Sequence, residues 1–159
     1  GLWLVMMMCF FGALSTSMDL VAELPIRRRE RRGGVTLFPY VMSKAAPCAL
    51  LALLFPLSAL IALRLVPGDI TSGPPLMSWV VLAPMFFASA CVGLFISSLV
   101  KTPMGAIMPV LFYTMAHVVL LLLFPGAEML RSEWVVLANA TLAPLALIGA
   151  GLSLRIRGG

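Results

Sequence analysis

The sequence is poor in charge and nearly without histidine. Charged residues make up 11% of the 159 residues, and 62% are apolar, whereas soluble domains carry about 25% charged residues. A soluble fold of this length has neither enough core to bury so many apolar side chains nor enough surface charge to stay dissolved. The composition excludes a soluble domain, a disordered chain and a disulfide-rich secreted module, and it predicts a polytopic membrane protein.

Residues that enzymes and metal sites commonly use are also scarce. A Walker A phosphate loop needs Gly-Lys followed by Ser or Thr, but Ser43 precedes Lys44 and Val100 precedes Lys101. One histidine, His117, argues against histidine-based metal sites and triads. The sequence therefore predicts no catalytic residue, no metal and no cofactor in this chain. We interpret the three cysteines as small apolar side chains inside spans: Cys9, Cys48 and Cys91.

Five apolar stretches are long enough to cross about 30 Å of hydrocarbon as helices, which takes about 20 residues each. None shows the alternation of a membrane barrel strand. Within lipid, a helix satisfies all its own backbone groups. We therefore expect an all-α integral membrane fold in one transmembrane domain over residues 1–159. The predicted spans are residues 2–21, 45–63, 77–100, 102–124 and 134–154.

The basic residues predict which side of the membrane each end of the chain occupies. With the first connection on one side, nine of the eleven basic residues fall on that side, and only Arg64 and Arg131 fall opposite. Because basic residues favour the cytoplasm, the N-terminus is expected outside and the C-terminus inside. Five spans with an outside start are unusual for a whole protein, so we expect one further helix upstream of Gly1.

Two acids near the cytoplasmic end of the first span are candidates for an ion-pair network. Asp19 and Glu23 are four residues apart and share one helix face. Acids near a helix C-terminus oppose the macrodipole and favour cationic partners, and arginines 27–29 follow directly. The pair is either a simple interfacial cluster or a network that, with Lys44, fixes the cytoplasmic loop relative to the span.

A run of basic residues occupies the same loop. It either anchors the loop at anionic lipid, at about 1 kcal/mol per basic residue, or docks to a cytoplasmic partner. Nucleic-acid binding is disfavoured because few aromatic residues are interleaved among the basic ones and because the loop lies against the bilayer. The run is Arg27, Arg28, Arg29, Glu30, Arg31 and Arg32.

Within the spans, His117 and Tyr113 lie one turn apart. An ionisable residue at membrane depth is a functional candidate, although a neutral histidine bonded between helices is also common. Small residues recur at four-residue spacing and predict close helix packing: Gly12 and Thr16 in one span, and Ser89, Gly93 and Ser97 in another.

The stretch ELPIRRRERRGGVTLFPYVMSK, residues 23–44, resembles the first intracellular loop of ABC type-2 transporter permeases, particularly the ABCG (White) group and its bacterial relatives. Leu24 departs from the arginine usual in that family. The short segment 125–133 replaces the long extracellular segment of the eukaryotic members, which favours a bacterial form. The residues that fit the pattern are Glu23, Pro25, Arg29, Glu30, Gly33 or Gly34, Tyr40, Ser43 and Lys44.

The resemblance implies an architecture and a set of partners. In that family the loop contains a coupling helix that touches an ATPase domain, often fused upstream, which carries the ATP and Mg. Six spans form one half and two halves form the transporter, so the five spans here would be the second to sixth. Pro39 would confine a loop helix to about residues 27–37, because helices tend to end before the residue that precedes a proline.

The sequence hypothesis is therefore the permease part of an ATP-driven exporter in a bacterial inner membrane, working by alternating access. The substrate would be amphipathic or lipid-like, because the spans hold no charge to bind an ion. Two alternatives stay open: a non-catalytic membrane scaffold or assembly subunit, and a lipid-modifying membrane enzyme. The residues expected to line a substrate cavity are His117, Tyr113, Thr114, Phe86 and Phe87.

Overall fold

The computed structural model describes residues 2–23, 37–65, 75–123 and 128–157. In these ranges the chain is helical apart from short turns, and the predicted all-α fold is confirmed. The elements are α1 (Leu2–Thr16), α2 (Asp19–Ala22), α4 (Leu37–Leu65), α5 (Pro75–Leu99), α6 (Pro103–Leu123) and α7 (Glu128–Arg157).

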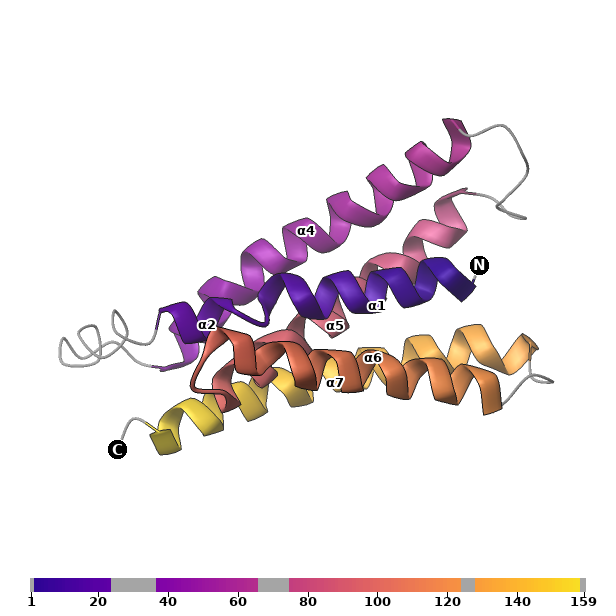
Figure 1. Ribbon diagram of the computed structural model, residues 1–159. Helices are drawn as coiled ribbons and strands as arrows, with labels where there is room; N and C mark the ends of the chain where they lie inside the picture. The colour runs from indigo at the N-terminus through magenta and orange to yellow at the C-terminus, as the bar shows by residue number, and fades with distance from the viewer. Residues whose placement is uncertain (1, 24–36, 66–74, 124–127, 158–159) are drawn as a thin grey trace.

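The long helices run alternately up and down along one direction (Figure 1). The end of α2, the start of α4, the end of α5 and the end of α7 lie at one end of the bundle. The start of α1, the end of α4 and the start of α5 lie at the other. The described basic residues Lys44, Lys101 and Arg155 therefore share one end, whereas Arg64 lies at the opposite end.

Helix α5 is the centre of the bundle. In an 18-residue apolar window within Ser78–Leu99 of α5, 67% of the residues are buried, against 22% in such a window within Pro39–Leu65 of α4. Each of the four buried apolar clusters includes α5 residues, among them Phe86, Leu94 and Ile96. Helices α1, α4 and α7 all pack against α5, so α5 is in contact with more of the bundle than any of them.

The small residues of α1 and α5 form the tightest contact in the bundle, as their spacing predicts. A Cβ added at Gly12 would lie 2.7 Å from the carbonyl oxygen of Phe86. Thr16 Oγ1 donates a hydrogen bond of 2.6 Å to the carbonyl oxygen of Ala90. The absence of larger side chains lets the two backbones approach, so that a side-chain hydroxyl of α1 reaches a backbone carbonyl of α5, which is how helices associate where water supplies no driving force.

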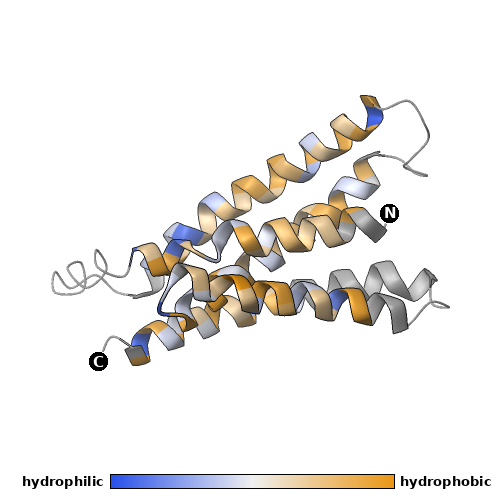
Figure 2. Cartoon of the chain, in the orientation of Figure 1, coloured by the Kyte–Doolittle hydropathy of each residue, from blue (hydrophilic) through white to orange (hydrophobic). Residues whose placement is uncertain are grey.

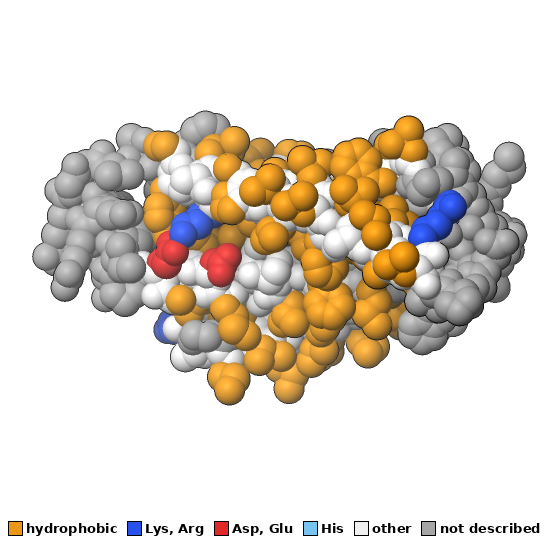
Figure 3. Space-filling view, turned by 90° about the horizontal axis from the view of Figure 1, so that it is seen from above, with side chains coloured by type: hydrophobic (Ala, Val, Ile, Leu, Met, Phe, Trp, Pro, Cys, Tyr) orange, Lys and Arg blue, Asp and Glu red, His pale blue; other side chains and the backbone are white. Residues whose placement is uncertain are grey.

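The outward faces are apolar over most of their length. Figure 2 shows apolar colours dominating the described helices between their ends, and Figure 3 shows an apolar face with acidic and basic side chains near one end and a basic side chain near the other. Two stretches, Pro39–Leu65 and Ser78–Leu99, are long and apolar enough to cross a membrane. Shorter apolar stretches lie at Met6–Ala22, Met104–Val119 and Thr141–Ile156. Such exposed apolar surface is what lipid-facing helices carry.

The helix bounds differ from the predicted spans in three places. The first span is not one helix, because α1 ends at Thr16 and α2 begins at Asp19. Helix α4 begins at Leu37, so the predicted loop 23–44 ends earlier and its last residues lie in the first turns of α4. Helix α7 covers residues 128–157 where a span of 134–154 was predicted. Helix ends depend on caps, glycine and proline, so a helix need not end where an apolar stretch ends.

Prolines interrupt backbone hydrogen bonding without ending the helices that contain them. Helix α4 continues through Pro47 and Pro56. A proline leaves a carbonyl one turn earlier without its usual donor, and membrane helices tolerate this where a neighbour supplies a donor. Pro56 leaves the carbonyl of Ala52 without its usual donor. The Trp79 indole N–H of α5 donates to the next carbonyl oxygen, that of Leu53, at 3.0 Å. This bond attaches α4 to α5 near its middle.

Candidate functional site

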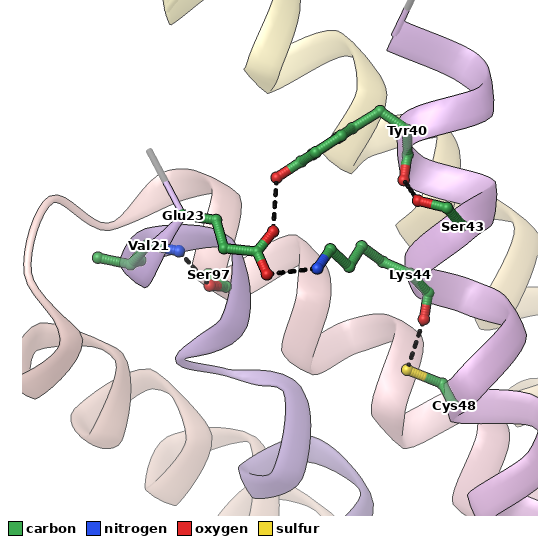
Figure 4. A network of polar contacts seen from close by, with 7 residues as sticks. All are labelled: Val21, Glu23, Tyr40, Ser43, Lys44, Cys48 and Ser97. Carbon is green, nitrogen blue, oxygen red and sulfur yellow. Dashed lines mark hydrogen bonds and ion pairs between the residues drawn. The ribbon is translucent and has the colours of Figure 1, made fainter. Parts of the chain in front are cut away.

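Glu23 joins α2 to α4 at one end of the bundle (Figure 4). Its carboxylate Oε1 forms an ion pair with Lys44 Nζ, and its Oε2 accepts a hydrogen bond of 3.0 Å from the Tyr40 hydroxyl. Tyr40 and Lys44 are one turn apart on α4, so both reach the same carboxylate. Glu23 directly precedes residues 24–36, and α4 begins directly after them. The contact therefore fixes the two ends of that segment to each other.

The charge distribution at this site keeps Glu23 ionised. The hydrogen bond from Lys44 is the main cause that lowers the pKa of the Glu23 carboxyl, and the Tyr40 hydroxyl adds to it against the opposing effect of burial. Asp19, the first residue of α2, also attracts Lys44 electrostatically. The structure thus brings together the three residues that the sequence assigned to the loop ion-pair network.

The expected arginine partners, residues 27–29, lie outside the described residues, as does the whole basic run from Arg27 to Arg32. Sequence reasoning gave Lys44 a place in the network but did not foresee Tyr40 as a direct partner of Glu23. The signal was available, because Tyr40 and Lys44 have the four-residue spacing that places two side chains on one helix face.

A second polar contact holds α2 against α5. The backbone N–H of Val21 donates to the hydroxyl of Ser97 at 3.1 Å, and Ser97 is buried (Figure 4). Leu20 lies in the same apolar cluster as Leu94 of α5 and Val41 of α4. The sequence marked Ser97 only as a small packing residue, since no pattern in one sequence shows that a backbone donor 76 residues away lacks a partner.

The predicted cavity residues of α6 form a polar chain that faces α5. The Tyr113 hydroxyl lies 3.2 Å from the Ser89 hydroxyl. His117 Nδ1 lies 3.0 Å from the carbonyl oxygen of Tyr113. The centroids of the two rings are 4.5 Å apart, in an edge-to-face arrangement. Thr114 is buried and donates to the carbonyl oxygen of Val110 within its own helix. Of the candidates, Tyr113 and His117 are therefore together.

The two aromatic candidates of α5 lie in the apolar core. Phe86 is 2% exposed and belongs to the cluster of Met8, Ala52, Leu60 and Leu82. Its ring also lies 5.2 Å from that of Phe55 in α4. Phe87 is partly buried and packs against three of the four apolar clusters. Both side chains pack α5 against its neighbours, and neither is part of the Tyr113–His117 chain.

No group of three or more His, Cys, Asp or Glu in the described part of the chain is placed to hold a metal ion. The polar groups that are placed together make an ion pair, hydrogen bonds between helices and hydrogen bonds within one helix. Such groups hold or move helices relative to one another. We call residues 24–36, which contain the basic run, the charged segment. The fold and this site define a multi-pass helical membrane protein with an ion pair between the elements that flank this segment.

Residues 2–147 match the protein family described as ABC-2 type transporter. The match covers most of the chain, so the chain belongs to this family of transporter membrane domains. Neither a curated protein nor a solved structure matches it. Domains of this family are the membrane components of transporters, and they generally act with an ABC ATPase and dimerise. The predicted resemblance to ABC type-2 permeases is confirmed.

Proposed function

We propose that this chain is the membrane-spanning part of an ATP-driven exporter that moves an amphipathic or lipid-like substrate by alternating access. ATP and Mg would bind to an ATPase domain, separate from this chain or fused upstream, and two permease halves would enclose the substrate. The basic run of residues 27–32 would dock to the ATPase. The permease function follows from the family, and these further steps are the hypothesis.

The observation that carries the proposal is the contact of Glu23 with Tyr40 and Lys44. Because it ties α2 to α4, a displacement of the charged segment between them reaches two elements of the bundle together. Helix α4 is largely exposed and the central helix α5 largely enclosed, with 22% and 67% of the residues in their apolar windows buried. A loop fixed at both of its ends transmits a displacement, whereas a loop free at one end dissipates it by bending.

The proposed substrate class rests on the chemistry of the spans. The described parts of α5 and α6 between their ends hold one ionisable ring, His117, and otherwise hydroxyl and apolar side chains. Neutral hydrogen-bonding groups next to aromatic rings suit a molecule with a polar head and an apolar body. We propose that Tyr113, His117 and Thr114 contribute to the substrate path, whereas Phe86 and Phe87 pack α5 against its neighbours.

We also propose an orientation in a bacterial inner membrane. The bundle end that carries Lys44, Lys101 and Arg155 would face the cytoplasm, in keeping with the excess of basic residues at cytoplasmic ends. The charged segment would then be accessible to the ATPase, which must lie in the cytoplasm because its substrate, ATP, is there.

Charge reversal in the basic run tests this proposal. The transporter with its ATPase is reconstituted in vesicles, and uptake of a fluorescent single-chain amphiphile and its stimulation of ATP hydrolysis are measured. Arg29→Glu and Glu30→Lys should each lose transport and stimulated hydrolysis while keeping the folded state. Arg64→Glu, at the opposite end of the bundle, is the matched control and should retain both activities.

The alternative functions predict other outcomes of the same experiment. A scaffold or assembly subunit would lose neither activity on charge reversal, because it would contribute no force to the spans. A lipid-modifying enzyme would change the amphiphile chemically without needing ATP, which chromatography of the recovered probe detects. Either result would replace the exporter proposal.

A further inference from the structure

Helix α2 starts without a cap of its own. The first N–H groups of a helix have no partner inside it, and an oxygen-bearing side chain at the N-cap position ordinarily accepts a bond from the second or third of them. Met18 occupies the N-cap position of α2 and makes no side-chain cap bond. A methionine side chain has no oxygen to offer, so the N-cap residue itself supplies no side-chain acceptor to the start of α2.

Ser97 of α5 supplies the missing acceptor. Val21 is the third residue of α2, and its N–H donates to the Ser97 hydroxyl at 3.1 Å. In an uninterrupted helix this N–H would bond four residues back along the same chain. Ser97 is 1% exposed, so no water competes for the bond. Leu20, next to Val21, is buried in the cluster that contains Leu94 of α5.

The neighbouring residue on α5 makes a different contact. Ser98 donates to the carbonyl oxygen of Phe95 at 2.6 Å and accepts a bond from the Ser153 hydroxyl of α7 at 2.5 Å. Two adjacent hydroxyls at the same end of α5 thus hold two different elements, α2 and α7. Of these two serines, only Ser97 bonds to α2, the element that directly precedes the charged segment.

We propose that Ser97 is a positioning residue: it caps α2 from α5 and so makes α5 move together with α2, the element that directly precedes the charged segment. This inference rests on the proposed exporter function. It adds a second route by which displacement of the charged segment reaches the helices. The Glu23 contact transmits displacement to α4, and the Ser97 bond transmits it to α5. Because α5 contacts α1, α4 and α7, displacement of α5 reaches most of the bundle.

The cap itself is tested by hydrogen exchange in the complete transporter, reconstituted in vesicles with its ATPase. Ser97→Ala removes the acceptor, and the amides of residues 18–23 should exchange about fivefold faster, the change expected for losing an ordinary N-cap. Ser98→Ala is the matched control on the next residue and should leave these amides unchanged. Equal exchange in wild type and Ser97→Ala would overturn the inference.

A double variant separates positioning from local capping. Met18→Asn places an acceptor at the N-cap of α2 itself, so Met18→Asn with Ser97→Ala should return the exchange of residues 18–23 to within about twofold of wild type. The attachment to α5 stays broken. A bimane fluorophore at Val80→Cys, on the exposed far part of α5, reports α5 movement on addition of ATP and vanadate.

The ATP-dependent fluorescence change should fall at least threefold in Ser97→Ala and should stay low in the double variant. If the double variant restores it, Ser97 is only a local cap and the positioning role is overturned. If wild type itself gives no ATP response, the proposed exporter function and the positioning role fail together. The exchange experiment uses no ATP, so it still decides whether Ser97 caps α2.

Discussion

Gly93 of α5 lies against the backbone of Ala13 in α1. A Cβ at Gly93 would stand 2.3 Å from the Ala13 carbonyl oxygen, and equally close to the hydroxyl oxygen of Thr16. One of these obstacles is backbone, which cannot move without shifting α1. The close approach is also what brings Thr16 within bonding distance of Ala90. The position therefore demands glycine because of its neighbour's backbone.

Gly93→Ala should destabilise the bundle by about 1–3 kcal/mol, the usual cost of forcing extra volume into a packed interface. The substitution raises intrinsic helix propensity, so a loss of stability reports the clash alone. The measurement is thermal unfolding of the purified protein in detergent, followed by circular dichroism.

Gly151→Ala in α7 is the matched control. A Cβ there meets nothing within 4 Å, so this variant should be as stable as wild type or slightly more so. Equal transition temperatures for the Gly93 and Gly151 variants would show that α1 and α5 are not in backbone contact.

The Glu23–Lys44 ion pair predicts a dependence of stability on pH. A glutamate in an unfolded chain titrates near pH 4.3, at about its reference pKa, and contact with Lys44 lowers the pKa of Glu23 in the folded protein. The pair therefore stabilises the fold above about pH 4.3 and loses this contribution as the pH falls through the lower folded value. Glu23→Gln should flatten that part of the stability profile, measured by urea unfolding between pH 3 and pH 7.

The size of this effect is modest because both side chains are partly exposed, at 26% and 33%. Partly exposed pairs contribute at most about 1 kcal/mol. Lys44→Gln should produce nearly the same flattening, and the double variant should add little further. Additive effects of the two variants would mean that the side chains do not interact.

The Ser89–Tyr113 contact predicts an interaction between α5 and α6. Tyr113→Phe and Ser89→Ala each remove one partner of a part-buried hydrogen bond, which should lower stability by about 1 kcal/mol. The double variant should lose less than the sum of the two, because the second change removes a bond already broken. The free energy of unfolding of the four proteins checks this, and additive losses would contradict a direct bond.

Much of the fold could be predicted because apolar length and small-residue spacing depend on local sequence. The five long helices lie over the five apolar stretches, and the spacing of Gly12 with Thr16 and of Ser89 with Gly93 predicted faces of close packing. That these two faces pack against each other is a finding of the structure. The break at residues 17–18 could not be predicted, since hydropathy continues across it. What stabilises the break is Ser97, which lies 76 residues away from Val21.

The candidate site, like the fold, could be predicted only in part. Asp19, Glu23 and Lys44 could be grouped by charge, because acids near a helix end require cationic partners. The four-residue spacing of Tyr40 and Lys44 shows that they share a helix face, but that this face meets Glu23 depends on how α4 packs beside α2. For the same reason Phe86 was predicted as a cavity residue, whereas its ring packs in the core beside Phe55 and Met8.

The proposed orientation predicts which ends of the helices an impermeant reagent reaches. Leu65 ends α4 beside Arg64 and is 79% exposed, and Ile156 lies near the end of α7 and is 80% exposed. These residues are at opposite ends of the bundle (Figure 1). In intact bacterial cells, Leu65→Cys should react with a charged maleimide added outside, and Ile156→Cys should react only after the membrane is permeabilised. The three native cysteines are buried, so wild type provides an unlabelled background. Labelling in the reverse order would place the basic end outside. The charged segment could then not meet a cytoplasmic ATPase, because a helical bundle that crosses the membrane presents only one of its ends to each side.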